Sequence, residues 1–580
     1  MLCVGLCRGH GEQFTKNVEI TKILNDVADM LEMQGVEFKP QAYRRAARTI
    51  EALGEPVEGL YSAGKLDELP GIGPSIAKKI AEIIETGSLK YHQELKKKTP
   101  VNLEELLTIE GIGPKTAGLL YEKLGIKSLA DLERAAKLHK LREIKGLGPR
   151  TEENVLESLE LAKGRKGRTL LGTAYPLAES ICKQLQKEGI KVEIAGSLRR
   201  MKETIGDVDI LASAMDPNDL SNEFSKMPDV AKVLEKGETK SSVLLQGGIQ
   251  VDLRIVEAGS FGSALMYFTG SKDHNIALRK VAIAKGFKLN EYGLFKGETR
   301  VAGDDEEGVY HQLGLDYIPP ELREDQGEIE AARIHELPTL IPYDSLQGDL
   351  QMHSTWSDGH RTIEEMARAA QQIGHSYIAI TDHYSPIPVV HGLNTRRVRE
   401  QAAEIDRVNQ DLRGIRILKG VEVDIAADGT LTAENDVLRE LDVVVASIHS
   451  SFKQTKKVMT QRIIAAMEND FVNIIGHPTS RKINQRNPCE IDMDALFDAS
   501  KRTGTFLEVN ASPQRLDLND ATVRLALEAG CKLAIDTDAH DKEELNNARF
   551  GIAVARRGWA TQADVINTRG RDELEKLLKK

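Results

Sequence analysis

The sequence predicts a multidomain protein of mixed α+β and α/β class, with a helical region first, an α+β region next and a distorted (β/α)7 barrel last. Three patterns predict this: Gly-Pro turns between helical segments up to residue 162, strand-like runs among helices from 169 to 260, and apolar runs alternating with amphipathic helices from 346 onward. A chain of 580 residues exceeds the size of one hydrophobic core. Several domains are therefore expected.

Composition narrows the class of protein. Apolar residues make up 41% and charged residues 29%, as in ordinary globular proteins, and no run of about 18 apolar residues predicts a membrane span. The five cysteines are scattered, which favours a reducing cytoplasm over a disulfide framework. The net charge of −11 neither proves nor excludes DNA binding, so local motifs must decide.

The helical region contains a repeat. "LPGIGPSIAKKI" (69–80), "IEGIGPKTAGLL" (109–120) and "IKGLGPRTEENV" (144–155) share Gly-apolar-Gly-Pro ahead of a helical pattern. The proline suits a first helical turn, and backbone amides at such a turn hold a phosphate without reading base sequence. The repeat resembles the helix-hairpin-helix motif of DNA-repair proteins; a helical solenoid with Gly-Pro turns is the alternative. The predicted DNA-binding glycines are Gly71, Gly73, Gly111, Gly113, Gly146 and Gly148.

The segment "AGSLRRMKETIGDVDIL" (195–211) carries the first chemical constellation. Strand periodicity places Asp207 and Asp209 on one face, where paired carboxylates favour a bound cation. Asp252, in "IQVDLRI", lies on another strand and can join that face. Oxygen ligands alone suit Mg²⁺ or Mn²⁺, and the preceding Gly-Ser turn can receive a polyphosphate, which together predict two-metal phosphoryl transfer.

With "YFTGSKDHNIALRK" (267–280) and "KGFKLNEYGLF" (285–295), this region resembles the nucleotidyltransferase palm of the family X DNA polymerases. The resemblance implies that Asp207 and Asp209 bind both metals, while Asp252 binds one and helps to deprotonate the primer 3′ hydroxyl. Ile205 and the pair Lys272 and His274 depart from the family pattern, which puts one triphosphate contact and the grip on the nucleotide in doubt. By position, the triphosphate would be held by Gly196, Ser197, Arg200 and Gly206, and the sugar pocket would be lined by Tyr267, Phe268 and Gly270. Asn275 would face the nascent pair, and DNA would be contacted by Arg254 and Arg279.

The N-terminal helices resemble the small lyase domain of the same polymerases through "FKPQAYRRAARTI" (38–50). The resemblance places Lys79 at the Schiff-base position and Lys39 and Tyr43 near a 5′ phosphate. Lys78 would add like-charge pressure on the amine, but Ser75 replaces a lysine of the animal members. Two readings stay open: a lyase, or binding of the 5′ end of a gap alone.

Histidines and carboxylates follow the strand-like runs of the barrel, at the face where barrel active sites form. Imidazole with carboxylate suits Mn²⁺ or Zn²⁺, and this set could hold two to three ions. The set resembles the polymerase-and-histidinol-phosphatase (PHP) domain, which implies a metal-dependent phosphoesterase with 3′–5′ exonuclease activity and, in some members, abasic-site incision. Gln351 replaces the first histidine of the family's His-x-His, and its neutral amide predicts a weakened ion position. The expected ligands are His353, Asp358, His383, Glu422, His449, His477, Asp538 and His540.

Together these motifs predict a monomeric, cytoplasmic and nucleoid-associated gap-filling DNA polymerase and exonuclease that acts on gapped or nicked DNA with dNTPs and needs no membrane. A template-independent nucleotidyltransferase and a DNA-binding scaffold with an inactive PHP domain are the alternatives. The expected domains are a disordered extension (1–15), a lyase-like domain (16–95), a further helix-hairpin-helix domain (96–165), the palm (166–262), a nascent-base-pair subdomain (263–320), a linker (321–345) and the PHP domain (346–580).

Overall fold

The computed structural model describes residues 10–51, 57–107, 109, 112–144, 146–164, 168–387 and 390–578. The chain forms two compact units, one of residues 1–166 with 484–486 and one of 167–483 with 487–580. Each unit is described by itself below. Within the described ranges, no helix has the length and apolar character needed to cross a membrane.

The first unit is helical, and its core lies between α1 and α2, where Leu24, Val27, Ala46 and Ile50 are fully buried. Helix α1 begins at His10, so residues 10–15 are helical and the expectation of a disordered extension was wrong for them; residues 1–9 lie outside the described ranges. The helices are α1 (His10–Met33), α2 (Lys39–Glu51), α3 (Val57–Ser62), α4 (Pro74–Thr86), α5 (Lys90–Lys98), α6 (Leu103–Leu106), α7 (Pro114–Leu124), α8 (Leu129–Lys137) and α9 (Pro149–Gly164).

The three Gly-Pro repeats begin three of these helices. Pro74, Pro114 and Pro149 are the first residues of α4, α7 and α9, where a missing N–H costs no intrahelical hydrogen bond. Gly73 and Gly113 are the extended N-cap residues. All three repeats therefore lead into a helix that begins at the proline, as the sequence pattern predicted.

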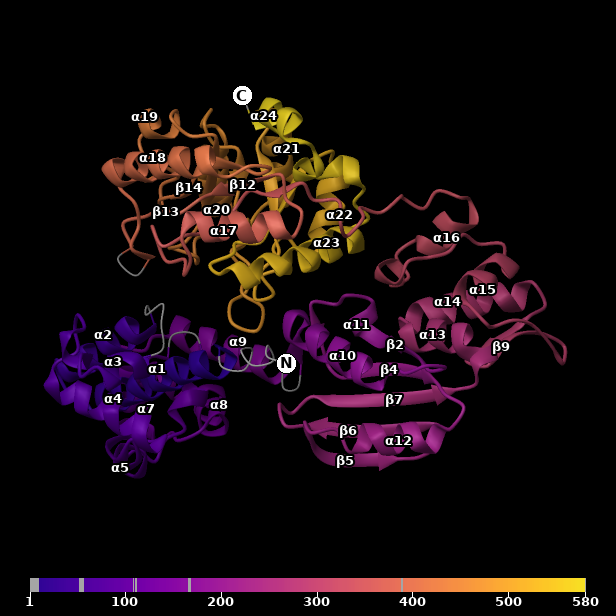
Figure 1. The fold of residues 1–580 in the computed structure, drawn as a ribbon, viewed down its shortest axis with the longest axis horizontal. Helices are drawn as coiled ribbons and strands as arrows, with labels where there is room; N and C mark the ends of the chain where they lie inside the picture. Colours follow the sequence, from indigo (N-terminus) through magenta and orange to yellow (C-terminus); the bar gives the residue numbers. More distant parts are fainter. Residues whose placement is uncertain are drawn as a thin grey trace, which may run out of the picture. The chain divides into compact units, whose positions relative to one another are not determined.

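The palm opens the second unit (Figure 1). Its sheet has the order β2-β4-β7-β6-β5, in which β4 and β7 are parallel neighbours; α10 packs on β2 and β4, and α12 on β5 and β6. The elements are β1 (Thr169–Leu170), α10 (Leu171–Leu185), β2 (Lys191–Ile194), α11 (Gly196–Arg199), β3 (Thr204–Ile205), β4 (Val208–Ser213), α12 (Pro217–Ser225), β5 (Val230–Lys236), β6 (Lys240–Leu245) and β7 (Gln250–Val256).

A smaller subdomain follows the palm and extends further than expected. Residues 321–345 were expected to be a linker, but Leu322, Ala332 and Leu340 join its apolar core and Arg323 is fully buried. The acidic and Pro-rich composition was misread, because Glu321, Arg323 and Glu328 are buried and paired inside the protein. The elements are α13 (Phe261–Thr269), α14 (Lys272–Ala284), β8 (Lys288–Asn290), β9 (Gly293–Lys296), β10 (Thr299–Ala302), α15 (Glu306–Gln312) and α16 (Glu328–Arg333).

The C-terminal barrel is an eight-stranded parallel sheet in the order β11-β12-β14-β15-β16-β17-β18, with β13 paired to β14. A parallel bridge between Met352 and Ala539 joins the first and last strands, which nearly closes the barrel. The strands are β11 (Gly348–Asp349), β12 (Tyr377–Ile380), β13 (His383–Tyr384), β14 (Arg416–Asp424), β15 (Val443–Ser447), β16 (Ile474–Ile475), β17 (Phe506–Asn510) and β18 (Leu533–Asp536). The helices around them are α17 (Ile363–Gln372), α18 (Thr395–Asp411), α19 (Asn435–Leu438), α20 (Lys456–Met467), α21 (Met493–Thr503), α22 (Asp520–Glu528), α23 (Ala548–Arg557) and α24 (Arg571–Leu578).

Candidate active sites

The palm site is organised by two neighbouring parallel strands. Asp209 of β4 and Asp252 of β7 are directly opposite each other in the register, and Asp207 lies just before β4 on an exposed bend. Asp252 is buried and accepts a hydrogen bond of 2.9 Å from the Gln250 amide. The structure thus brings the predicted carboxylates to one end of the sheet.

The electrostatics of Asp209 favour a cation at this place. Burial, followed by the charges of Asp207 and Asp252, raises the pKa of Asp209 to about 7, although Arg254 and Arg200 lower it. A carboxyl group with a raised pKa is one whose negative charge lacks compensation. A divalent ion would supply that compensation, which is the fit expected for Mg²⁺ or Mn²⁺.

Gly196 has a steric reason to be glycine. Its φ is +62°, and a β-carbon there would collide with the Asp209 carboxylate. The adjacent Ala195 N–H donates to the Asp209 carbonyl at 2.8 Å, which ties the start of α11 to β4. The Gly-Ser turn, in which Ser197 is half-buried, therefore lies against Asp209.

The two arginines after this turn have separate tasks. Arg199 donates twice to the Glu306 carboxylate, at 2.8 and 2.7 Å, and once to the Thr269 hydroxyl, so it is a structural ion pair. Arg200 instead donates Nε to Glu324 at 3.1 Å and Nη1 to the Thr269 carbonyl at 2.5 Å. Among the described residues, Arg200 Nη2 has no hydrogen-bond partner. Gly206 is exposed at the same bend as Asp207.

The residues expected around the sugar and base lie close to this turn. The rings of Tyr267 and Phe268 meet edge to face, with centroids 5.2 Å apart, and the Arg254 guanidinium lies 4.7 Å from the Phe268 ring. Asn275 donates to the Tyr267 carbonyl at 2.7 Å. Gly270 begins the turn to α14, and Arg279 is on that helix with Nε bonded to the Asn275 carbonyl.

Two of the residues that depart from the family pattern, Ile205 and His274, are buried, whereas Lys272 is exposed. Ile205 is fully buried in the palm core, and its strand pairs with Thr169. His274 is also fully buried, between Glu328 at 2.6 Å and the Tyr310 hydroxyl at 2.9 Å. The expectation that His274 changes the grip on the nucleotide was therefore wrong, because both ring nitrogens serve the subdomain core.

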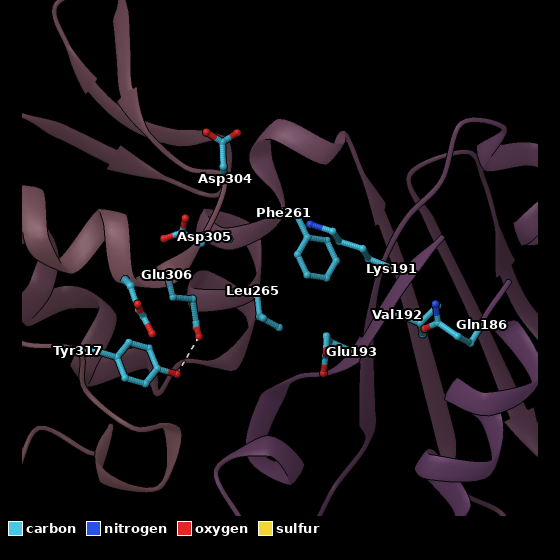
Figure 2. A pocket seen from close by; sticks show the side chains of 12 residues that line it. Gln186, Lys191, Val192, Glu193, Phe261, Leu265, Asp304, Asp305, Glu306 and Tyr317 are labelled. Carbon is cyan, nitrogen blue, oxygen red and sulfur yellow. Dashed lines mark hydrogen bonds between the residues drawn. The ribbon is translucent and has the colours of Figure 1, made fainter. Parts of the chain in front are cut away.

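A cavity of about 740 Å³ lies between β2 and the subdomain, and its lining does not include Asp207, Asp209 or Asp252 (Figure 2). Its walls carry Lys191, Glu193, Phe261 and Tyr317, and the Tyr317 hydroxyl donates to Glu306 at 3.1 Å. Arg199 and Arg323 neutralise Glu306 and lower its pKa to about 2, in spite of burial. The cavity thus adjoins a structural ion pair.

The expected lyase residues form a small cluster in the first unit. The Lys79 ammonium lies 5.9 Å from the Tyr43 ring centroid and 5.5 Å from that of Tyr91, and donates to the Ser75 hydroxyl at 3.2 Å. Burial, then the neighbouring Tyr91, raises the pKa of Tyr43 to about 12. Lys39 is exposed at the start of α2.

The hairpin glycines are open to a partner. A β-carbon at Gly73, Gly113, Gly146 or Gly148 would meet no described atom within 4 Å, and one at Gly71 would meet only Arg45 and Thr49. A phosphate could therefore approach these turns closely. Gly111 lies outside the described residues.

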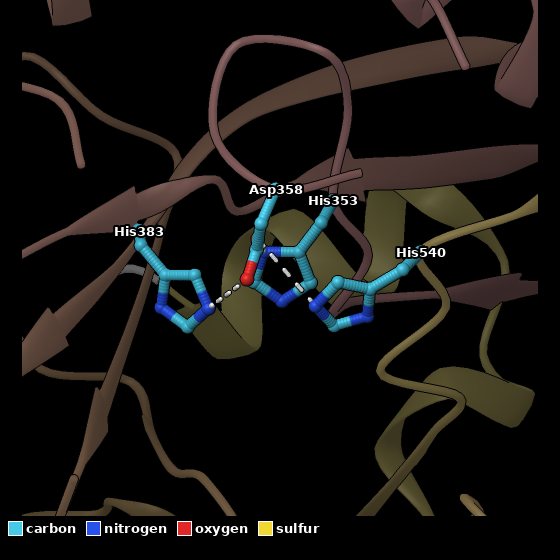
Figure 3. A group of neighbouring side chains, drawn as sticks. All are labelled: His353, Asp358, His383 and His540. Atoms are coloured by element: carbon cyan, nitrogen blue, oxygen red, sulfur yellow. Dashed lines mark ion pairs between the residues drawn. The ribbon is translucent and has the colours of Figure 1, made fainter. Parts of the chain in front are cut away.

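The barrel site collects the predicted ligands around a cavity of about 430 Å³. Figure 3 shows one group, in which the rings of His353, His383 and His540 surround the Asp358 carboxylate. His383 Nε2 lies 3.6 Å and His540 Nε2 3.5 Å from Asp358 oxygens. His353 Nε2 lies 3.1 Å from an Asp538 oxygen. This contact connects the segment after β11 to the loop after β18.

Glu422 of β14 is the centre of a second group. One carboxylate oxygen lies 2.8 Å from His383 Nδ1, and the other lies 3.1 Å from His477 Nε2 and 3.4 Å from His449 Nε2. Because its two oxygens face different histidines, this carboxylate can bridge two ions. All eight predicted ligands therefore meet at one end of the barrel.

In the barrel site, protons on the histidines compensate the negative charge of the carboxylates, as bound cations would. Although burial opposes protonation, Glu422 and Asp424 raise the pKa of His449 to about 10, and Asp358 and Asp538 raise that of His540 to about 10. Burial opposes ionisation of Glu422, but His449 and His383 lower its pKa far below the usual range. Transition ions would replace these protons, so the donor set fits Mn²⁺ or Zn²⁺.

Gln351 is fully buried in this site. Its amide nitrogen donates to Glu422 at 3.1 Å, while its carbonyl oxygen has no hydrogen-bond partner among the described residues. The amide nitrogen thus serves Glu422, and the neutral carbonyl oxygen is the atom of this side chain that could ligate an ion. A structural reason for a weakened ion position is present.

Two residues of the barrel site were not predicted. Asp424 accepts from His449 Nδ1 at 2.7 Å and orients Nε2 toward Glu422; its position two residues after Glu422 on one strand could have indicated it. Arg515 lines the cavity with Nε 3.5 Å from Asp538, and its Nη1 is buried with no described partner. No sequence motif marks Arg515.

Comparisons with known proteins cover most of the chain. Family models match residues 264–324 (DNA polymerase beta thumb), 15–89 (helix-hairpin-helix domain), 103–161 (SAM-like helix-hairpin-helix tandem) and 349–512 (PHP domain). The chain is 38% identical over 572 residues to the DNA polymerase/3′-5′ exonuclease PolX of Bacillus subtilis (strain 168), which covers 97% of the chain and 99% of that protein. It is 27% identical to DNA polymerase lambda of Rattus norvegicus over 53% of the chain and 56% of that protein. A probable phosphatase of Thermoanaerobacter sp. (strain X514) is 32% identical over 37% of the chain and 87% of that protein.

Proposed function

Because the chain belongs to the family X DNA polymerases that carry a C-terminal PHP domain, we propose that it fills short gaps during DNA repair and trims 3′ ends with its barrel. The resemblance expected from the motifs is confirmed. One observation carries the synthetic activity: Asp209 and Asp252 face each other on parallel strands beside a Gly-Ser turn that has no room for a β-carbon. That arrangement supports nucleotidyl transfer at the palm.

At the palm site, the chain's own groups position the substrates. Asp207, Asp209 and Asp252 would hold Mg²⁺ or Mn²⁺, which supplies charge stabilisation for in-line transfer. Asp252 would accept the proton of the primer 3′ hydroxyl, and Gly196, Ser197, Arg200 and Gly206 would bind the triphosphate. Tyr267, Phe268 and Gly270 would enclose the sugar, and Asn275, Arg254 and Arg279 would contact the base pair and DNA.

At the barrel site, the imidazole and carboxylate side chains would hold two to three Mn²⁺ or Zn²⁺ ions, which supply Lewis acidity for phosphodiester hydrolysis. Asp424 keeps His449 in the tautomer that presents Nε2. The Arg515 guanidinium would balance the charge of the scissile phosphate. Gln351 would leave one ion position weak, so the nuclease should act more slowly than one with the full ligand set.

The hairpin turns support binding of gapped or nicked DNA. The backbone amides of Gly71, Gly73, Gly113, Gly146 and Gly148, where little or nothing would crowd a β-carbon, would hold backbone phosphates without reading base sequence. We propose that the protein acts as a monomer at the nucleoid. Light scattering of the free protein and of its complex with gapped DNA tests the oligomeric state.

Primer extension tests the main proposal against template-independent transfer. On a one-nucleotide gap in a DNA duplex, the protein should insert the dNTP complementary to the template base in preference to the other three. Equal insertion of all four dNTPs would overturn the proposal. Retained insertion with no nuclease would leave the palm assignment intact and reject the exonuclease.

The cluster at Lys79 supports a second activity, removal of a 5′-deoxyribose phosphate. Two tyrosine rings and Ser75 fix the ammonium in place, as a Schiff-base nucleophile requires. Borohydride trapping on a gapped duplex with a 5′ sugar phosphate should give a covalent adduct that Lys79→Ala removes. Lys97→Ala is the control, because Lys97 is an exposed lysine of the same unit, on α5. An unchanged adduct in Lys79→Ala would exclude this role.

A further inference from the structure

The barrel contacts the palm and its subdomain through arginines. Each of these arginines belongs to the barrel and reaches a glutamate of the polymerase core, within the same compact unit. Repeated ion pairs of this kind fix how the barrel is aligned at its boundary with the polymerase core. The pairs are Arg481 with Glu203 at 2.7 Å, Arg549 with Glu179 at 3.2 Å, Arg556 with Glu321 at 2.7 Å and Arg557 with Glu324 at 3.1 Å.

Arg557, the last residue of α23, is buried and reaches both sides of this boundary. Within the barrel it binds the Asp520 carboxylate at 2.7 Å. Across the boundary, Nη1 lies 3.1 Å from Glu324 Oε1 and donates to the backbone carbonyl of Arg200 at 2.7 Å. One guanidinium thus links the barrel to the chain segment that follows the Gly-Ser turn.

Glu324 makes a second connection to the same residue. Its Oε1 atom, which faces Arg557, also accepts from Arg200 Nε at 3.1 Å. Arg200 is therefore held at its carbonyl by Arg557 and at its guanidinium by the carboxylate that Arg557 neutralises. Burial opposes ionisation of Glu324, but Arg557 and Arg200 lower its pKa, so the carboxylate stays charged.

We infer that Arg557 of the barrel is a positioning residue for nucleotide insertion in the palm, where it fixes the orientation of Arg200 toward the triphosphate. The inference rests on the proposed role of Arg200 in binding the triphosphate. An arginine side chain loses considerable rotamer freedom when it binds a ligand, and a second residue that fixes it beforehand reduces that loss. The nuclease domain therefore contributes to the affinity of the polymerase for its nucleotide.

Arg556 provides a matched comparison. It precedes Arg557 on the same helix, pairs with Glu321 across the same boundary and donates to the Ile341 carbonyl at 2.7 Å. Among the described residues, Arg556 makes no hydrogen bond or ion pair with Arg200. A general weakening of the boundary would affect both variants, whereas a positioning role belongs to Arg557 alone.

The experiment measures KM for the dNTP and kcat on a one-nucleotide gap, with 3′–5′ exonuclease activity on the same full-length preparations. Arg557→Gln should raise KM about tenfold and change kcat less than about twofold, because the lost interaction acts on binding. Exonuclease activity should stay at the parent level. Arg556→Gln should leave KM within about twofold of the parent.

Arg200→Ala separates this inference from the proposed function. It should raise KM at least as much as Arg557→Gln, and the double variant should show no further increase, since both act through one side chain. If Arg200→Ala leaves KM unchanged, the triphosphate role of Arg200 fails. If Arg200→Ala raises KM while Arg557→Gln does not, or while Arg556→Gln raises it equally, the positioning role alone is overturned.

Arg557→Lys covers the case in which Arg557→Gln does not fold. Lysine keeps the buried charge but cannot bind the Asp520 carboxylate, the Glu324 carboxylate and the Arg200 carbonyl together, because it lacks the planar fork. KM should rise about threefold in a protein that circular dichroism shows to be folded. A folded Arg557→Lys protein with the parent's KM would contradict the inference.

Discussion

The palm site and the barrel site both gather carboxylates at parallel strands, but they differ in chemistry and enclosure. The palm uses oxygen ligands alone, and Asp207 is exposed. The barrel adds five imidazoles, and His353 and His477 are almost fully buried. The palm arrangement suits hard ions such as Mg²⁺, which exchange with each nucleotide. The barrel arrangement suits transition ions such as Mn²⁺ or Zn²⁺, which remain bound. We therefore expect an exchangeable metal site in the palm and a retained one in the barrel.

The largest expected effect tests whether the two sites act separately. Asp209→Ala should lower gap filling about 1,000-fold or more and leave exonuclease activity intact, because its carboxylate would bind both metal ions of the palm. His449→Ala should do the reverse. Both rates are measured on the same gapped duplex. Loss of both activities from either substitution would show that the sites are coupled or that the variant is misfolded, which circular dichroism distinguishes.

Metal removal should separate the sites next. After gel filtration without added metal, we expect roughly two transition ions per chain to remain in the barrel and the palm to be empty. Elemental analysis measures this, and His449→Ala provides the control with a disrupted barrel site. Mg²⁺ alone should then restore gap filling. Less than one retained ion per chain would favour the scaffold alternative.

Gln351 gives a smaller effect within the barrel. Gln351→His replaces the amide beside Glu422 with an imidazole, which should add about one ion per chain and raise Mn²⁺-dependent exonuclease activity roughly tenfold. Gap filling should not change. Gln371→His, on the outer helix α17, is the control. Unchanged metal content in Gln351→His would mean that the amide does not limit ion binding.

The smallest effect concerns stability and has a defined pH window. Because the pKa of Glu306 is lowered to about 2, its ion pairs stabilise the fold fully above the usual carboxyl pKa, and this contribution is lost as the pH falls toward about 2. Glu306→Gln should cost on the order of 3 kcal/mol at pH 7. Thermal melting should show a constant difference from pH 5 to 8 that shrinks below about pH 4.5. A difference that grows in acid would contradict this assignment.

Local periodicity made both sites predictable in outline. The spacing of Asp207 and Asp209 fits a strand, and the barrel ligands each stand at or just after an apolar run. Such signals need only short-range information. Contacts between distant segments give no such local pattern. The contacts of Arg557 and Arg515 and the ion pairs of residues 321–345 could therefore not be predicted.

Composition gave a wrong prediction where charged residues are buried as ion pairs. The segment 321–345 has the Pro and acid content of an exposed connection, yet Glu321, Arg323 and Glu328 are buried with partners. His274 was misjudged for the same reason, since its partner Glu328 lies 54 positions away. Sequence distinguishes a buried ion pair from a solvated charge only when the partner is near in the chain.

The close fit between α10 and the barrel bears on how this protein can be divided and how such chains arise. A β-carbon at Gly172 would collide with Pro513, and Phe550 packs against the same apolar cluster as Leu171. A barrel expressed alone would expose these apolar groups together with arginines that have lost their glutamates. Exchange of the barrel between homologues should therefore succeed only when the matching palm surface is exchanged with it. In evolution, the polymerase core and the barrel would then be passed on together as one unit.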